Sequence, residues 1–268
     1  MVNLGTDEIV KYPFLAEAGK YLNDKGFSLE QFGTDPDLKK IVDMAFERIK
    51  ISTEGKIYSS NLSQSDSSLP MEVFSFLIAV ILLKLTGMNT LIRRFSLAEA
   101  RRSERFLEKD LSNYKDKTKE QMALKIMHDL FSITIQKQGD DFIIPASNYL
   151  KHSINFYERE WKLVNRKMNN GSVFLTSHET VRLVRKEIDL YISSKIYSAN
   201  TPEMIVGFQE YVNKLRTLAK KFEVKIIESS EYPPCIKHAI EILEKGENLS
   251  HSGRFMLGTY LLAKGQQV

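Results

Sequence analysis

Apolar residues recur at helical spacing along most of this chain, and the pattern predicts a mainly helical protein. The most apolar run, residues 73–83, lies in a predicted helix from Pro70 to about Gly87. This helix is apolar on every side, which is typical of the central helix of a bundle. The run spans about 16 Å, roughly half of the hydrocarbon core of a bilayer. We therefore expect it to be buried in protein and not to cross a membrane.

Capping residues predict further helices around this central one. Pro13 opens a helix that closes at Gly26, because proline suits a first turn and glycine the position after a last turn. Other helices are predicted after Asp35-Pro36, from an Asn89 cap to about Lys109, from a Thr118-x-x-Gln121 capping box, and from Thr201-Pro202 onward. The polar, serine-rich residues 59–68 are predicted to form a loop.

The pattern changes between residues 130 and 199, where short alternating runs predict strands. Strands are predicted at residues 133–137 and 142–144, and Asn169-Asn-Gly171 predicts a hairpin between residues 162–167 and 172–175. Helices are predicted from Pro145 to about Arg159 and after a Ser177 cap. The predicted fold class is mainly α, a helical body with a small inserted α/β subdomain of short hairpins plus helices.

Three predicted units follow from these patterns. The helical body comprises residues 1–129 and 200–225, the small α/β subdomain residues 130–199, and a tether with a C-terminal fragment residues 226–268. In the fragment, a Pro-Pro pair opens a helix that ends at Gly246, and Ser250 caps a second helix.

Composition narrows the function only slightly. With 43% hydrophobic and 27% charged residues, the chain has an ordinary globular composition. A net charge of +4 permits contact with nucleic acid without requiring it. The single cysteine, Cys235, excludes an internal disulfide framework and suits a reducing compartment. The N-terminal residues have no apolar core, so no signal peptide is predicted.

Arginines are repeated along the helix predicted from Asn89 to Lys109. On a wheel of about 100° per residue, Arg94, Arg101 and Arg105 fall within about 40° of one another. Such a stripe suits contact with a phosphate backbone without reading of bases. The alternative is a solvated face whose arginines pair with the nearby Glu104 and Glu108.

Glu99 falls within the apolar face of the same helix. A buried carboxylate is costly unless it is paired, so a structural salt bridge is favoured over a catalytic base. No cluster of carboxylates for two-metal nucleotide transfer is visible, and Asp140-Asp141 are assigned to turn chemistry. His128, His152 and His178 are predicted to be surface or capping residues, and Trp161 to be a core residue.

The C-terminal fragment carries the most specific motifs. Its sequence reads Pro233-Pro-Cys-Ile236 and then Gly246-Glu-Asn-Leu-Ser-His-Ser-Gly-Arg-Phe255. This run resembles the start of the iron–sulfur domain of the archaeal and eukaryotic DNA primase large subunit. Tyr12-Pro-Phe-Leu15, Arg94-Phe-Ser-Leu-Ala-Glu-Ala100 and Trp161-Lys-Leu-Val-Asn-Arg-Lys167 are similar to segments of the same family, in the same order. The short N-terminal body is more like the archaeal members.

The resemblance implies a non-catalytic subunit of a DNA primase in an archaeal-type cell, cytoplasmic and nucleoid-associated. The expected partners are the catalytic small subunit, the single-stranded DNA template and the RNA primer, with a third subunit as an alternative source of the C-terminal domain. A surface on the small α/β subdomain is the hypothesis for small-subunit docking. The rival hypothesis is a stand-alone helical nucleic-acid-binding or adaptor protein.

The resemblance also assigns roles in the C-terminal fragment. Cys235 matches the first of four cysteine ligands of the family's 4Fe-4S cluster, and His251 and Arg254 match residues that handle the primer 5′-triphosphate and the template. Because a cluster takes four cysteine ligands and this sequence has one, we expect no cofactor in this chain. A free thiol at Cys235 and loosely presented His251 and Arg254 are the alternatives.

Overall fold

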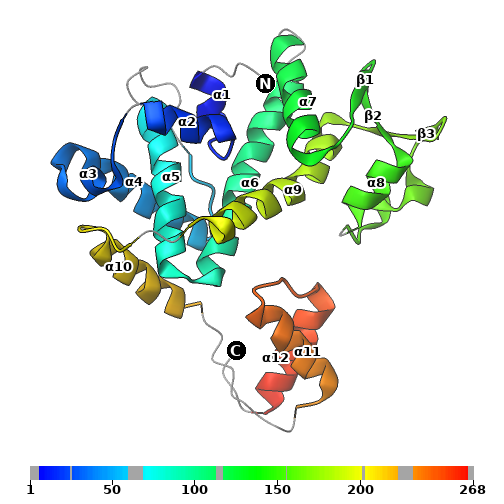
Figure 1. Cartoon of the computed structure of the whole chain (residues 1–268). Coiled ribbons are helices and arrows are strands. Elements are labelled where there is room, and N and C mark those ends of the chain that lie inside the picture. The colour runs from blue at the N-terminus through cyan, green and yellow to red at the C-terminus, as the bar shows by residue number, and fades with distance from the viewer. Residues whose placement is uncertain are drawn as a thin grey trace.

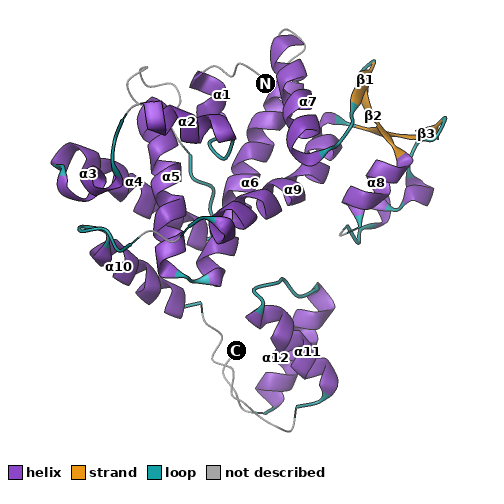
Figure 2. Cartoon of the chain, in the orientation of Figure 1, coloured by secondary structure: helices purple, strands orange, loops and turns teal. Residues whose placement is uncertain are grey.

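The computed structural model describes residues 6–24, 26–59, 69–112, 117–154, 156–200, 203–222 and 232–264. Helices make up most of these residues, and short strands gather at one end (Figure 2). The predicted fold class, mainly α with a small α/β subdomain, is confirmed. The predicted loop at residues 59–68 and the predicted helix start at Thr201-Pro202 lie almost entirely outside the described residues.

The helices and strands follow one another as shown in Figure 1. Those of the first half are α1 (Thr6–Lys11), α2 (Ala16–Asp24), α3 (Leu29–Thr34), α4 (Pro36–Thr53), α5 (Leu69–Thr86), α6 (Asn89–Leu111) and α7 (Lys117–Phe131). Those of the second half are β1 (Gln136–Gln138), β2 (Asp141–Pro145), α8 (Ala146–Ser153), the 3-10 turns η1 (Arg159–Trp161) and η2 (Leu163–Asn165), β3 (Met168–Asn169), β4 (Ser172–Leu175), α9 (Ser177–Ser198), α10 (Gln209–Lys220), α11 (Pro234–Glu244) and α12 (His251–Ala263).

Helix α5 is the central helix of the body, as its all-round apolar sequence predicts. It packs against α1, α2, α4, α9 and α10. Val73, Ile78 and Leu83, on three different sides of it, are all fully buried. Among the described residues, no helix combines the length and the apolarity that a bilayer span requires. The energy that holds the body together therefore comes largely from covering α5 on every side.

The predicted start of the N-terminal helix, at Pro13, is wrong. Pro13 lies in a turn between α1 and α2, and the second helix begins at Ala16. A residue before proline is disfavoured in helical conformation, which fits the end of α1 at Lys11 just before Tyr12. The predicted end is correct, since Gly26 follows α2 with a positive φ of 69°.

Several other predicted helix boundaries are also wrong. Met88 caps α6 in place of Asn89, and Thr176 caps α9 in place of Ser177, with Glu179 completing a capping box. Thr118 lies inside α7, and α8 ends at Ser153 well before Arg159. Helix α10 begins at Gln209, so Ile205 and Phe208 are buried in the turn before it.

The small sheet is antiparallel throughout, with strand order β1-β2-β4-β3. The predicted hairpin turn is confirmed at Asn170 and Gly171, which have φ of 46° and 74°. The strand predicted at residues 162–167 is wrong, because these residues form η2 and a short connection, and β3, which pairs with β4, begins only at Met168. Helix α9 contacts both this sheet and α6, and so joins the small unit to the body (Figure 1). The predicted domain boundaries stay a prediction.

The C-terminal helices α11 and α12 form a pair with a small core of their own. Ile236, Ala239, Leu249 and Leu257 are buried in it, separate from the main core. Both predicted caps are present, since Gly246 follows α11 with a φ of 68° and the Ser250 hydroxyl accepts from the Gly253 amide at 3.1 Å. Figure 1 shows this pair below α5 and α6.

Candidate nucleic-acid interface

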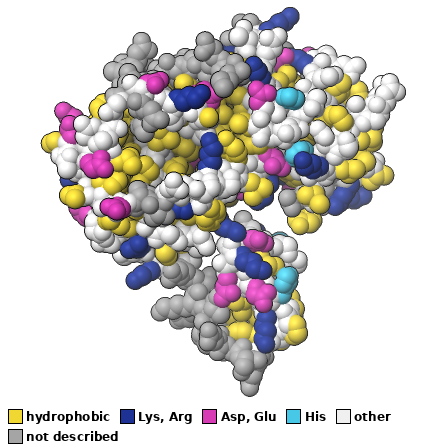
Figure 3. All heavy atoms as spheres, in the orientation of Figure 1, with side chains coloured by type: hydrophobic (Ala, Val, Ile, Leu, Met, Phe, Trp, Pro, Cys, Tyr) yellow, Lys and Arg dark blue, Asp and Glu magenta, His cyan; other side chains and the backbone are white. Residues whose placement is uncertain are grey.

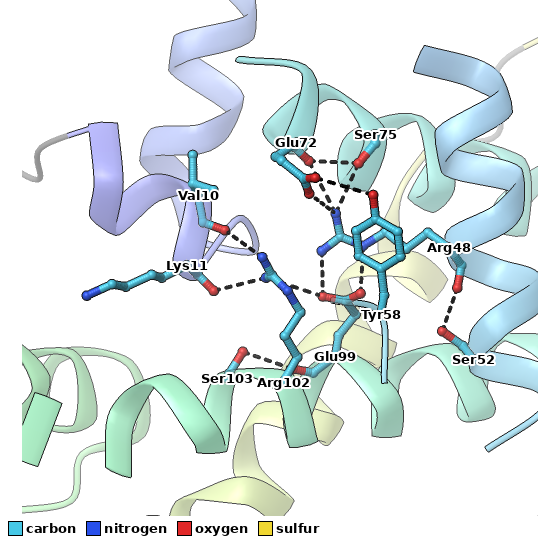
Figure 4. Close-up of polar contacts among 10 residues, drawn as sticks. All are labelled: Val10, Lys11, Arg48, Ser52, Tyr58, Glu72, Ser75, Glu99, Arg102 and Ser103. Carbon is cyan, nitrogen blue, oxygen red and sulfur yellow. Dashed lines mark hydrogen bonds and ion pairs between the residues drawn. The ribbon is translucent and has the colours of Figure 1, made fainter. Parts of the chain in front are cut away.

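Helix α6 carries a buried ionic cluster on one face and exposed arginines on the other. On the buried face, Glu99 receives two hydrogen bonds of 2.7 Å from Arg48 of α4 (Figure 4). Both side chains are fully enclosed. Burial alone would raise the pKa of Glu99, but the charge and hydrogen bonds of Arg48 outweigh it and leave that pKa below its usual value. The structural salt bridge predicted for Glu99 is confirmed.

The Arg48 guanidinium also reaches α5. It donates to the Glu72 carbonyl oxygen at 3.2 Å and to the Ser75 hydroxyl at 3.0 Å. The rings of Tyr58 and Phe76 flank it, with centroids 4.9 and 5.3 Å away. Burial and the Glu72 carboxylate raise the pKa of Tyr58 to about 12. Arg48 thereby fixes α4, α5 and α6 against one another.

Arg102 extends the cluster to α1. Its guanidinium donates to the carbonyl oxygens of Val10 and Lys11, each at 3.3 Å, and lies 3.9 Å from Glu99 (Figure 4). Burial and the nearby Arg48 charge lower the pKa of Arg102 to about 10, so it remains charged at neutral pH. A cation at the last carbonyls of a helix is favourable, and Arg102 thus ties the end of α1 to α6.

The three arginines of the predicted stripe have different surroundings. Arg94 donates to the Thr53 carbonyl oxygen at 2.6 Å, and its guanidinium lies 4.2 Å from the Phe222 ring. Arg101 is half-buried and Arg105 is exposed, and within the described ranges neither makes an ion pair.

The acids expected to neutralise the stripe pair elsewhere. Glu104 binds Arg185 at 3.1 Å and Glu108 binds His178 at 3.0 Å. The stripe therefore keeps its positive charge, but its contact with nucleic acid stays a prediction.

A cleft runs beside this stripe. It has a volume of about 350 Å³, and Arg93, Arg94 and Arg101 line one wall while residues of the α11–α12 turn line the other. Sequence reasoning missed Arg93, because on the helical wheel it stands apart from the stripe. It also could not find the far wall, which comes from residues about 150 positions later.

The predicted C-terminal site residues are exposed on the α11–α12 pair. Cys235 is the second residue of α11, and His251 and Arg254 lie in the first turn of α12. Arg254 donates to the Leu249 carbonyl oxygen at 3.0 Å, which directs its side chain along the helix start. Their roles stay predictions. The assignment of Cys235 as a ligand of a 4Fe-4S cluster also stays a prediction, since one cysteine alone cannot hold a cluster that takes four.

The predictions for the remaining titratable residues are only partly correct. His128 and His178 are exposed, as predicted. His152 was predicted at the surface but is buried, with its Nδ1 2.9 Å from Glu187. Trp161 is a core residue, although it lies in η1 and not in a strand. Within the described ranges, no three His, Cys, Asp or Glu side chains are grouped closely enough to hold a metal ion.

Comparison with known proteins finds similarity to one class of replication protein. Residues 225–268 match the family described as the C-terminal domain of the large subunit of eukaryotic and archaeal DNA primase. The chain is 28% identical to the DNA primase large subunit PriL of Methanosarcina barkeri and 27% identical to that of Methanosarcina acetivorans, each over 98% of its length. It is 24% identical to PriL of Halobacterium salinarum over 94% of its length. The chain is a relative of the archaeal DNA primase large subunits.

The likeness to primase large subunits covers both the helical body and the C-terminal pair. The chain spans 63% of the Methanosarcina barkeri relative and 70% of the Methanosarcina acetivorans relative. The similarity to the Methanosarcina barkeri PriL extends over 98% of the chain, which includes the helices that carry the Arg48–Glu99 pair and the basic cleft.

Proposed function

We propose that this chain acts as the non-catalytic large subunit of an archaeal-type DNA primase. In this role it binds the catalytic small subunit, makes contact with the template and positions the initiating nucleotide while the partner makes the RNA primer. The observation that carries the proposal is an exposed apolar surface on the small α/β unit, in a chain whose relatives are named primase large subunits.

The docking surface consists of Leu150, Ile154, Tyr157 and Val164. Their exposed fractions are 51%, 72%, 81% and 89%, which is unusual for large apolar side chains so close in sequence. Leu150 and Ile154 are four residues apart, at the end of α8 and just after it, and therefore face the same way. Figure 3 shows hydrophobic side chains over this unit, on the right of the view. A protein partner with a matching apolar surface is the occupant that this chemistry favours.

A rigid support lies beneath this surface. The rings of Trp161 and Phe156 are stacked 4.2 Å apart, and Arg182 lies over both while it binds Glu158 at 2.6 Å. Tyr149 donates to the Trp161 carbonyl oxygen at 2.8 Å. A preorganised surface loses little conformational entropy on binding, so this packing favours stable association.

Catalysis in this proposal resides in the small subunit, and positioning comes from the large subunit. Holding template, nucleotide and partner in one geometry lowers the entropic part of the barrier for joining two nucleotides. The uncompensated arginines Arg94, Arg101 and Arg105 supply a sequence-independent grip on the template. His251 and Arg254 supply contacts to the initiating nucleotide.

Size-exclusion chromatography with the catalytic subunit of a closely related primase tests the docking surface. Val164→Asp is expected to abolish co-elution, because it places a charge in an apolar interface. Val206→Asp is the matched control, since Val206 is 78% exposed and lies in the body. Co-elution of the Val164→Asp variant, or loss of co-elution with both variants, contradicts the proposed surface. If the unaltered chain fails to co-elute and changes no primer synthesis, the stand-alone adaptor hypothesis replaces the primase role.

Template contact needs a separate experiment. We expect replacement of Arg94, Arg101 and Arg105 by alanine to weaken binding of single-stranded DNA by the assembled complex and to reduce the salt dependence of that binding. Each lost phosphate contact on a single strand lowers the slope of log affinity against log salt by about 0.7. An unchanged slope shows that the stripe is only a solvated face.

A further inference from the structure

The cleft beside α6 is built from two parts of the chain that are distant in sequence. Its body wall includes Thr90, Arg93, Arg94 and Arg101 of α6, together with Phe222 just after α10. Its other wall is the turn after α11, with Leu243, Gly246, Glu247 and Asn248. A volume of about 350 Å³ is large enough for several phosphate groups or one nucleotide.

The body wall offers many hydrogen-bond donors with few acceptors to satisfy them. Arg94 uses one guanidinium donor on the Thr53 carbonyl oxygen and keeps the others, and Arg101 makes no ion pair with any described residue. The charge of Arg93 acts on Asp189 of α9, but the two side chains are too far apart to form an ion pair. Guanidinium groups that line the same cleft repel one another, and an anion bound between them removes this repulsion.

A hydroxyl group in the cleft also has no partner. Thr90 Oγ1 is shielded from solvent and makes no hydrogen bond to the described residues. A buried hydroxyl without a partner is costly, and a phosphate oxygen can accept its proton. The far wall carries one carboxylate, that of Glu247, which would repel a phosphate. The three arginines and this one acid together give the cleft a net charge of +2.

The turn of the C-terminal pair comes unusually close to the arginines. Gly246 has a φ of 68°, and a Cβ at this position would lie 2.8 Å from Cδ of Arg93. The backbone conformation therefore favours glycine here, and any larger residue would have to displace the Arg93 side chain. The close approach puts the two walls within reach of one small ligand.

We infer that this cleft binds phosphate groups, with Arg93, Arg94 and Arg101 as ligands, and that the bound phosphates hold α11–α12 against the body. The ligand is a nucleoside triphosphate or the backbone of a single strand, which share this chemistry. The inference rests on the proposed primase role, because it assigns that role a phosphate site at the junction of the two parts. The junction carries Lys and Arg side chains in Figure 3.

Isothermal titration of the full chain tests the site with three probes: sodium tripolyphosphate, ATP, and an oligothymidylate without terminal phosphates. We expect the double variant Arg93→Gln/Arg101→Gln to bind the preferred probe at least ten-fold more weakly than the unaltered chain. Arg159→Gln, at an exposed arginine outside both the cleft and the arginine stripe of α6, serves as the matched control and is expected to stay within two-fold. Glu247→Gln is expected to bind more tightly, because it removes the acid from the cleft.

The outcomes separate the two ligand sources from a failed inference. Tighter binding of tripolyphosphate and ATP assigns the site to a free nucleotide, and tighter binding of the oligothymidylate assigns it to a strand. Equal losses in the double variant and in Arg159→Gln, or no binding of any probe, overturn the site. Co-elution with the catalytic subunit does not depend on these residues, so failure here leaves the proposed binding of the small subunit standing.

The single cysteine allows a direct test of whether bound phosphate holds α11–α12 against the body. Cys235 is exposed on α11, and Lys109→Cys adds a second exposed position at the end of α6. With spin labels on both, pulsed electron resonance is expected to show a narrower distance distribution when saturating tripolyphosphate is added. The Arg93→Gln/Arg101→Gln background abolishes this narrowing. If the distance distribution between the two labels is identical with and without tripolyphosphate, the inference that bound phosphates hold α11–α12 against the body is overturned.

Discussion

Arg48 of α4 and Glu99 of α6 form a two-point ion pair, with both nitrogen–oxygen distances at 2.7 Å and both side chains shielded from solvent. The pair joins α4 to α6, contacts α5 through Arg48, and is shared with Arg102, which holds the end of α1. The orientation of α6, and with it the direction in which the exposed arginines point, therefore depends on a charge cluster that lies entirely inside the body.

Removal of one partner of this pair is predicted to lower the free energy of unfolding far more than removal of both. Arg48→Met or Glu99→Leu alone leaves a buried charge uncompensated, at a cost of about 3–5 kcal/mol in the free energy of unfolding. The double variant Arg48→Met/Glu99→Leu loses less than either single variant, because neither member of the pair is left buried without the other. Urea unfolding followed by circular dichroism measures all three. A double variant whose loss equals the sum of the single losses would show that the two residues act independently.

Acid is predicted to weaken the same pair. Because the pKa of Glu99 is lower in the folded state, its stabilising contribution is complete above the unfolded glutamate value of about 4.3. It is lost as the pH falls through the lower folded value. The difference in unfolding free energy between the unaltered chain and Glu99→Gln should be constant from pH 7 to about 5 and should shrink below about 4. A difference that persists unchanged to pH 3 contradicts the assigned ionisation.

Arg102→Met is predicted to loosen α1 while the rest of the body stays intact. The substitution removes the hydrogen bonds to the Val10 and Lys11 carbonyl oxygens, each from a charged donor. We expect about 1.5–3 kcal/mol less local stability, which hydrogen–deuterium exchange detects as faster exchange in α1.

The control for this experiment is Arg216→Met. Arg216 makes the equivalent contact to the carbonyl oxygen of Leu85 at the end of α5. Its loss should leave exchange in α1 unchanged, and faster exchange there in both variants would indicate general destabilisation.

How far the sequence predicts the site is clear from Glu99 and Arg94. The position of Glu99 on an apolar helix face is enough to predict a buried salt bridge, because unpaired burial is so costly. Its partner Arg48 is 51 residues earlier, and nothing local in the sequence marks it. Likewise, helical angles predict that Arg94 shares a face with Arg101. They cannot predict that the Thr53 carbonyl and the Phe222 ring hold Arg94, since both come from other segments.

Helix positions were easier to predict than helix ends. Apolar spacing found α4, α5, α6 and α9, because a long buried stripe leaves few alternatives. Ends depend on single capping contacts and on tertiary packing. Pro13 illustrates this, since proline permits both a first helical turn and the turn that the buried ring of Tyr12 imposes. His152 illustrates the same limit for side chains, because its burial depends on the placement of Glu187 in α9.

The contact of α3 with the turn before α10 gives a last prediction, which concerns backbone packing. A Cβ on Gly33 would lie 1.9 Å from the Val206 carbonyl oxygen, so the two backbones cannot keep their present distance if Gly33 becomes alanine. We expect Gly33→Ala to destabilise the body by about 1–3 kcal/mol, as overpacking does elsewhere. Gly19→Ala in α2 is the control, because a Cβ there has no atom within 4 Å. Helix propensity makes that change stabilising by roughly 0.5–1 kcal/mol. Thermal unfolding of both variants gives the test, and equal melting temperatures would mean that α3 and the turn are not in backbone contact.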